Sequence, residues 1–360
     1  MRRIVFILLI VIAVIAVALV GLRLGQVSIA KIVMSRIAAQ NAGVDRAAAL
    51  PDGLHVFICG AGSPMPDPLR AGPCTGIVAG DQVFVVDTGS GSLSNLLRMG
   101  FPVGRVEAAV LTHLHSDHID GLGEFLMQSW INGLRTAPTP VWGPDGVSEV
   151  VSGFNAAYRI DSTYRQAHHG DDVANLTGFG GTPRRLEATI APVVIYDAGG
   201  LKVSSISVSH HPADPTLGLR FDYKGRSVTI SGDTIYNRGL VDMAQGTDLL
   251  LHDALNTEMV EIIRDPLYER GQVHLDKVLY DIQNYHARPV DAARAAHEAG
   301  AGALVLHHIV PPLPSRQLYP LFLQGTKSIY GGKITVAEDG QIISLPSGSD
   351  DIKYSNGFGF

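Results

Sequence analysis

The sequence predicts one α/β domain of two packed layers, which follows an apolar N-terminal segment. The chain has 360 residues, 46% of them hydrophobic, and a formal net charge of −6. After the N-terminal segment about 300 residues remain, which is enough for one large hydrophobic core. Short apolar runs typical of buried strands recur along this part of the chain, and several of them end in a histidine or an aspartate. The sequence has no repeats and no low-complexity tract, so a single domain is favoured.

The first predicted element is an apolar run over residues 4–22, which follows Arg2 and Arg3. This run is longer than the core of a usual signal peptide and long enough to span a bilayer. The basic residues before it favour a location of the remaining chain on the extracytoplasmic, periplasmic side. We therefore expect a signal-anchor transmembrane helix over residues 1–25, through which the membrane is a partner, and a juxtamembrane tether over 26–53. A cleaved signal peptide, which would leave a secreted or periplasmic protein, is the alternative.

Two cysteines, Cys59 and Cys74, flank the first predicted strand of the domain and the start of the second. These strands are expected to pair, and an oxidising compartment would permit a disulfide between them. Because nothing in their spacing demands a bridge, we expect two buried free thiols.

The most informative segment is Thr-His-Leu-His-Ser-Asp-His, which ends at His118. It follows the apolar run 108–111, which predicts a buried strand, and it precedes a glycine-containing turn into a helix. His113 and His115 share one face by the period-two rule, whereas Asp117 and His118 come after the chain has begun to turn. Imidazole and carboxylate together suit zinc, manganese or iron rather than calcium or magnesium. A loop of locally hydrogen-bonded histidines is disfavoured, because so many metal-competent groups are costly to desolvate without a cation.

Four downstream apolar runs repeat the pattern of a predicted strand that ends in a ligand-type residue. The runs cover residues 203–209, 227–230, 249–251 and 303–306. The ligand-type residues that follow them are His210 and His211, Asp233, His252 and Asp253, and His307 and His308. Loops at the ends of buried strands are where a rigid scaffold positions a site. We expect side chains from this set to complete a site for two metal ions, with His252 in a structural role rather than as a ligand.

In five ordered blocks the chain resembles the metallo-β-lactamase superfamily, and within it the branch that includes ribonuclease Z and arylsulfatase-like hydrolases. The blocks are Asp87-Thr88-Gly89, the His113–His118 motif, His210 with Gly218-Leu219-Arg220-Phe221 behind it, Ser231-Gly232-Asp233-Thr234, and His308 before Ile309-Val310-Pro311. The resemblance extends from about Val56 to about Ile343. It implies an αββα sandwich of two mixed β-sheets flanked by helices over residues 54–346, with a C-terminal tail over 347–360.

The resemblance also implies a binuclear metal site, for which we expect two Zn²⁺ ions, with Mn²⁺ and Fe²⁺ as alternatives. The implied ligands are His113, His115 and His210 for one ion, Asp117, His118 and His308 for the other, and Asp233 as the bridge between them.

Two of these ligand positions are ambiguous, because the sequence doubles the histidine at both. The register of the block that begins at Gly218 favours His210 over His211. The family usually shows Thr-His before a short apolar stretch with proline, which favours His308 over His307. A one-residue slip would turn either side chain to the opposite face.

The implied chemistry is hydrolysis. Two divalent ions about 3.5–4 Å apart can share a water and lower its pKa toward neutrality, which creates a bridging hydroxide nucleophile. Asp117 would orient this hydroxide as well as ligate. His286 is the candidate proton donor to the leaving group, and Asp253 is the carboxylate that would orient it, as in ribonuclease Z. The family usually has His-Ser-Thr where this chain has His286-Ala287-Arg288, so His286 as a helix cap is the alternative.

The ligand set has no cysteine, which suits hydrolysis of a phosphoester, sulfate ester or thioester. We expect attack on a small anionic ester, either a phosphodiester or a sulfate ester. The alternatives are a ribonuclease Z-type tRNA 3′-end endonuclease and a lactone or thioester hydrolase. A nucleic-acid partner is not expected, because residues 152–192 mix acidic residues with their arginines and form no basic arm. A purely structural metal site in a protein without catalytic activity is disfavoured, because every ligand position is filled. A homodimer is possible.

Overall fold

The N-terminal part of the chain forms one long helix. The structure, a computed structural model, describes residues 2–358 and divides into a unit that ends at Val44 and a unit over Asp45–Phe358. Helix α1 (Arg2–Asn41) makes up most of the first unit and continues through much of the predicted tether. Among the described residues, no helix is both long and apolar enough to cross a membrane. The side chains of residues 16–20, 22 and 24, within the predicted span, lie outside the described part. The predicted transmembrane helix is therefore not confirmed.

The second unit is built on two β-sheets, each with both parallel and antiparallel neighbours. The first sheet has the order β15-β14-β1-β2-β3-β4-β5-β6. Its strands are β1 (Gly53–Gly60), β2 (Cys74–Ala79), β3 (Gln82–Val86), β4 (Ala108–Val110), β5 (Thr139–Gly143), β6 (Gly181–Arg185), β14 (Gln341–Pro346) and β15 (Lys353–Asn356). The second sheet has the order β13-β12-β11-β10-β9-β8-β7. Its strands are β7 (Val193–Ala198), β8 (Leu201–Val208), β9 (Thr216–Tyr223), β10 (Arg226–Ile230), β11 (Leu249–Leu255), β12 (Ala303–Val310) and β13 (Lys333–Val336).

The helices of the second unit connect these strands. They are α2 (Ser92–Arg98), α3 (Ser116–Ile119), α4 (Leu122–Asn132), α5 (Val147–His169), α6 (Asp171–Ala174), α7 (Arg238–Met243), α8 (Thr257–Glu269), α9 (Val273–Asp281), α10 (Pro289–Glu298), α11 (Tyr319–Phe322) and α12 (Thr326–Ile329). Single turns of 3₁₀-helix lie at Ala47–Ala49, Val103–Arg105, Leu176–Gly178, Ile282–Asn284 and Arg316–Leu318.

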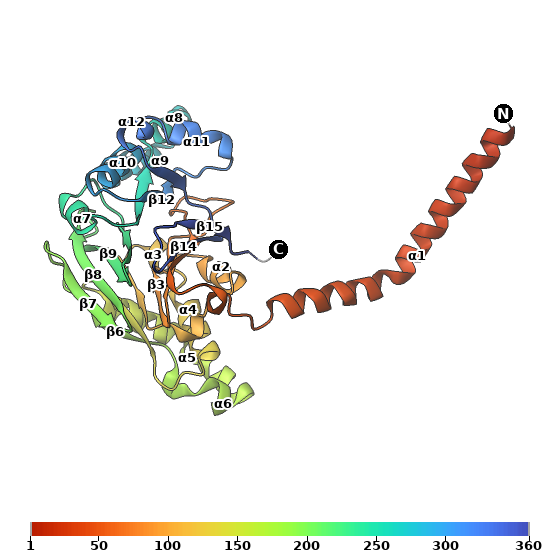
Figure 1. The fold of residues 1–360 in the computed structure, drawn as a ribbon, viewed down its shortest axis with the longest axis horizontal. Coiled ribbons are helices and arrows are strands. Elements are labelled where there is room, and N and C mark those ends of the chain that lie inside the picture. The colour runs from red at the N-terminus through yellow and green to blue at the C-terminus, as the bar shows by residue number, and fades with distance from the viewer. Residues whose placement is uncertain (1, 359–360) are drawn as a thin grey trace. The chain divides into compact units, whose positions relative to one another are not determined.

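The two sheets face each other across the main hydrophobic core. Phe84 on β3 packs against Phe221 on β9, with ring centroids 6.1 Å apart. The outer face of the first sheet is covered by α2 and α4, from which Leu96 and Phe125 are buried. The outer face of the second sheet is covered by α10, whose Ala296 is buried. Figure 1 shows these helices on opposite sides of the paired sheets. The predicted αββα sandwich of two mixed sheets is confirmed, because each sheet buries one face against the other and one against helices.

The chain beyond residue 346, which the sequence predicts as a tail, contributes an edge strand. β15 pairs antiparallel with β14, in a register that places Tyr354 opposite Ile343. Residues 359–360 of the predicted tail lie outside the described residues.

Cys59 and Cys74 form a disulfide, so the expectation of two free thiols is wrong. The antiparallel pairing of β1 with β2 has an irregularity between Ile58 and Gly60, and Gly60 is the partner of Cys74. This register brings the two cysteine Cα atoms to 5.1 Å, a separation that a disulfide requires. The pairing was predictable from the sequence, but the local irregularity that aligns the two cysteines was not.

Replacing both cysteines by alanine is expected to lower the free energy of unfolding by about 3 kcal/mol, because the bridge closes a loop of about 15 residues in the unfolded chain. Urea unfolding of the variant and of the wild type, each with and without reductant, measures this difference. Reductant should destabilise only the wild type. Equal stability of the oxidised wild type and the variant would contradict the prediction.

Candidate metal centre

The first metal-type motif lies where β4 ends and α3 begins. His113 and His115 are in the connecting loop, whereas Asp117 and His118 belong to the first turn of α3. The expectation that the chain turns between the two pairs therefore holds, and the motif presents ligand atoms in two directions. His113, Asp117 and His118 are all buried, which requires each to have a polar or ionic partner.

The first group of ligand atoms consists of three imidazole nitrogens. His113 Nε2 lies 3.0 Å from His115 Nδ1, and His210 Nε2 lies 3.3 Å from the same His115 nitrogen. These three residues form a cluster that could hold a metal ion. His210 is fully buried, whereas the His211 side chain is 86% exposed and pairs with Asp214. The structure thus places His210 in this cluster and His211 outside it.

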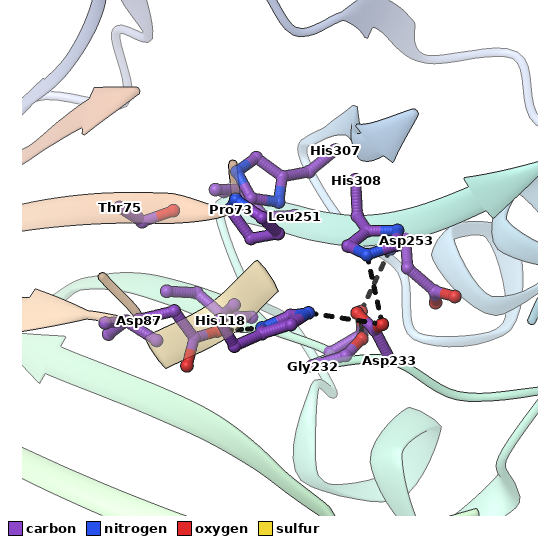
Figure 2. A pocket seen from close by; sticks show the side chains of 13 residues that line it. Pro73, Thr75, Asp87, His118, Gly232, Asp233, Leu251, Asp253, His307 and His308 are labelled. Carbon is purple, nitrogen blue, oxygen red and sulfur yellow. Dashed lines mark hydrogen bonds and ion pairs between the residues drawn. The ribbon is translucent and has the colours of Figure 1, made fainter. Parts of the chain in front are cut away.

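The second group combines a carboxylate with two imidazoles. His308 Nε2 lies 3.2 Å from Asp117 Oδ2, and His118 Nε2 lies 3.5 Å from the same oxygen. Asp233 stands between the two groups: its Oδ2 is 3.2 Å from His308 Nε2 and 3.3 Å from His118 Nε2. The same oxygen is 3.9 Å from the Nε2 atoms of both His113 and His210. Figure 2 shows His118 and His308 directed at Asp233 from two sides.

A β-bulge determines which of the doubled histidines on β12 enters the site. In the pairing of β11 with β12, Asp253 is opposite His307 but Ala254 is opposite Ile309, so His308 is the extra residue. His308 has a φ of +47°, a left-handed conformation that is unusual for a residue with a side chain. Bulges re-aim side chains beside active sites. Here His308 points to Asp233, while His307 is buried away from it (Figure 2). Because β12 continues to Val310, both histidines lie within the strand rather than after it.

Two of the buried imidazoles are arranged as metal ligands should be, with one nitrogen held by the protein and the other left for an ion. His118 shares a 2.9 Å hydrogen bond between its Nδ1 and Asp87, and His210 Nδ1 is 2.9 Å from the carbonyl oxygen of Tyr285. If both Nδ1 atoms donate, both Nε2 lone pairs face the site. Among the described residues, His118 Nε2 has no hydrogen-bond partner. An unsatisfied buried nitrogen beside two carboxylates fits a bound cation, and this donor set suits zinc.

The charges in the site are concentrated around Asp233. Burial raises the pKa of Asp233, but the imidazoles of His308 and His118 outweigh it and hold this pKa well below its usual value. Burial lowers the pKa of His118, and the carboxylates of Asp233 and Asp87 more than reverse this effect. By contrast, burial lowers the pKa of His307 to about 4, so His307 is neutral at pH 7. Asp233 is therefore a buried carboxylate whose negative charge is stabilised by positively charged groups around it.

His286 and Asp253, which the sequence predicts as a pair, are in direct contact. His286 Nδ1 lies 3.0 Å from Asp253 Oδ2, and the same His286 nitrogen is 4.0 Å from Asp233. Asp253 also contacts His252, whose Nδ1 is 3.0 Å from the other carboxylate oxygen. Burial raises the pKa of Asp253, and its bonds to His252 and His286 lower it below the usual value. His252 is fully buried and belongs to none of the clusters of ligand-type atoms in the described residues.

Asp87 supports the first motif through three hydrogen bonds. Its carboxylate accepts from the backbone N–H and the hydroxyl of Thr112, at 2.8 and 2.9 Å, and contacts His118 Nδ1. Replacing Asp87 by alanine is expected to weaken metal binding about 10- to 100-fold, because His118 loses the group that fixes its tautomer. Competition with a chromogenic chelator measures this affinity. Asp81→Ala, at an exposed position of the same hairpin, is the matched control, and equal affinities in both variants would contradict the prediction.

Two features of the site carried no sequence signal. The carbonyl of Tyr285 contacts His210, but every residue has a carbonyl. The bulge at His308 depends on the register between two strands that are about 50 residues apart in the sequence.

Comparisons with known proteins agree with this geometry. Residues 67–270 match the Metallo-beta-lactamase superfamily. The chain is 38% identical over 266 residues to a protein named Ribonuclease Z from Mycobacterium avium (strain 104), a match that covers 73% of this chain and 89% of the relative. A Ribonuclease Z of Mycobacterium bovis (strain BCG / Pasteur 1173P2) is 37% identical over 292 residues, which are 79% of this chain and 96% of that protein.

A solved structure supports the fold. The metallo-beta-lactamase fold protein YhfI from Bacillus subtilis is similar with a TM-score of 0.58 at 19% identity, and the match covers 82% of this chain and all of that one. The ordered sheets, the clustered histidines and aspartates and these matches lead to one conclusion: the chain belongs to the metallo-beta-lactamase superfamily, as a metal-dependent hydrolase related to the proteins named Ribonuclease Z.

Proposed function

We propose that this chain is a binuclear metal-dependent phosphodiesterase. The observation that supports this proposal is that Asp233 lies between two clusters of ligand-type atoms, each supplied by different strands. In the proposed site His113, His115 and His210 hold one ion and Asp117, His118 and His308 hold the other. Asp233 contributes to both. Two divalent ions in such a site supply a nucleophile at neutral pH by lowering the pKa of a shared water, and they neutralise the charge of an anionic ester.

The residues around the ions have separate roles in this proposal. Asp117 accepts a hydrogen bond from the attacking water and so orients it. His286 donates a proton to the leaving oxygen, because it lies beside Asp233, is not one of the proposed histidine and aspartate ligands of the two ions, and is held by the carboxylate of Asp253. Asp253 is a positioning residue, which holds the His286 ring by its Nδ1 and leaves Nε2 for the leaving group.

The 3′ end of precursor tRNA is the first substrate to test, because the relatives are named Ribonuclease Z. A small phosphodiester is the second candidate. It is favoured by the charge of the hairpin α8–α9, which leads from Asp253 toward His286. Residues 257–281 contain six acidic and three basic residues, a net charge of −3 with histidine neutral, and a polyanion is repelled by such a surface.

The disulfide indicates the compartment in which the protein acts. Disulfides persist in oxidising environments and are rare in the cytosol, so the bridge between Cys59 and Cys74 supports an extracytoplasmic site of action. We include this location in the proposal, and trapping of free thiols in intact cells tests it. Cys59 and Cys74 labelled by an alkylating reagent without prior reduction would contradict it.

A side-by-side assay tests the proposed activity. The metal-loaded full chain is assayed on a bis-aryl phosphodiester, an aryl sulfate, a lactone and precursor tRNA. We expect hydrolysis of the bis-aryl phosphodiester that is lost on chelation and restored by Zn²⁺. Hydrolysis of the lactone or the sulfate ester alone would refute a phosphodiesterase. Cleavage of precursor tRNA at its 3′ end in the same assay would decide between the two candidate substrates.

A further inference from the structure

An apolar cavity of about 650 Å³ opens directly onto the metal-type cluster. One end of the cavity is formed by residues of the site itself, among them Asp117, Asp233 and His286. This volume is in the range of pockets that bind small organic ligands, about 300–1,000 Å³. Because the cavity and the site share these side chains, a molecule that fills the cavity contacts the residues of the metal-type cluster.

The remaining walls of the cavity are mostly hydrophobic and come from segments that are distant in the sequence. They are provided by Met65 of the loop after β1, by Ile263 and Leu267 of α8, and by Leu275, Val278 and Leu279 of α9. No lysine or arginine of the described residues lines the cavity. A second phosphate of a polyanionic substrate would therefore find no cationic partner inside it.

Two residues of α9 keep apolar side chains at the entrance without a cover from the described residues. Leu275 is 44% exposed and Val278 is 54% exposed, although both line the cavity. Nearby charged side chains are already paired with one another: Arg264 contacts Glu261 and Asp276. Exposed apolar side chains that rim a cavity beside a catalytic site mark a binding surface rather than a packing fault.

We propose that this cavity binds an alkyl chain on one side of the scissile phosphodiester, so that the substrate is a small amphipathic phosphodiester. The inference rests on the proposed phosphodiesterase function and names the substrate class for that site. The alkyl chain lies between α8, α9 and the loop after β1, while the phosphate reaches Asp117, Asp233 and His286. Hydrolysis separates the chain-bearing fragment from the other ester group.

Binding measurements test the cavity independently of turnover. Methyl, butyl and octyl phosphate are titrated calorimetrically into the metal-loaded full chain, below their micelle concentrations. Each added methylene is expected to tighten binding roughly threefold to fourfold until the cavity is filled. Equal dissociation constants for methyl and octyl phosphate would overturn the inference.

A pair of double variants localises the effect. Leu275→Gln with Val278→Gln changes two cavity walls at exposed positions, and is expected to lower the ratio of octyl to methyl affinity by about tenfold. The matched control is Ile262→Gln with Val273→Gln. These residues of α8 and α9 are 57% and 64% exposed, and neither lines the cavity. This control should keep the wild-type ratio. The same ratio in both double variants would overturn the assignment of the chain to this cavity.

Turnover of methyl and octyl 4-nitrophenyl phosphodiesters separates this inference from the proposed function. Tighter octyl binding without hydrolysis of either diester would refute the phosphodiesterase and leave the alkyl site standing. Hydrolysis with equal kcat/KM for both diesters would refute the alkyl site and leave the phosphodiesterase standing. Cleavage of precursor tRNA with a higher kcat/KM than the octyl diester would overturn the alkyl chain as the natural occupant.

Discussion

Replacing Asp233 by alanine is expected to remove at least one metal ion per chain and to lower turnover by more than about 100-fold, because a shared ligand should matter more than the groups that only support ligands. Asp233 is buried, and one of its oxygens lies within 3.9 Å of nitrogens from four histidines. Without it, four imidazoles lose the negative charge around which they are arranged. Elemental analysis after gel filtration measures metal content, and circular dichroism reports whether the strands still form.

An exposed histidine next to a buried histidine of the site provides the control for the Asp233 variant. His211 is adjacent to His210 in the sequence, but its side chain is 86% exposed and outside the site. His211→Ala should therefore keep both ions and full activity. Two ions per folded chain in the Asp233 variant would rule out its role as a shared ligand.

Replacing His286 by alanine is expected to slow turnover by about 10²–10⁴-fold and to leave the metal content unchanged. His286 is held at 3.0 Å by Asp253 and reaches the edge of the site beside Asp233. If it donates a proton, the loss depends on the leaving group. An alkoxide needs that proton and should show the full loss, whereas 4-nitrophenolate, a much weaker base, should show little.

Comparing substrates distinguishes proton donation from the other roles open to His286. It also belongs to a cluster with His210 and Asp233 that could hold a metal, so a role as ligand would appear as metal loss. Asp253→Asn should show the same dependence on leaving group, since it disturbs the orientation of His286. His297→Ala, at an exposed position on α10, is the matched control. A loss of equal size on both leaving groups would contradict the donor role of His286.

Much of the site was predictable because its ligand atoms follow local rules. The apolar run 108–111 and the period-two rule predict a strand with His113 and His115 on one face, and the structure brings both together with His210. The order of downstream apolar runs likewise predicts that Asp233 and His308 lie at one end of the sandwich. Local periodicity was sufficient here, because each ligand-type residue follows an apolar run whose burial the sequence already indicates.

The rest depends on register and packing between distant segments. The bulge at His308 and the irregularity beside Cys59 are each a shift of one residue between paired strands, which apolar patterns do not encode. The cavity depends on Met65 meeting α8 and α9, about 200 residues later in the chain. The predicted strands ended at residues 251 and 306, whereas β11 and β12 continue to Leu255 and Val310, because polar residues within a buried strand interrupt the apolar pattern.

Anomalous diffraction from crystals of the zinc-loaded protein tests the binuclear site most directly. Two peaks about 3.5–4 Å apart are expected. One should lie within about 2.0–2.2 Å of nitrogens from His113, His115 and His210, and the other should be as close to atoms of Asp117, His118 and His308, with Asp233 reaching both. A single peak, or two peaks that leave Asp233 outside the coordination of either ion, would contradict it.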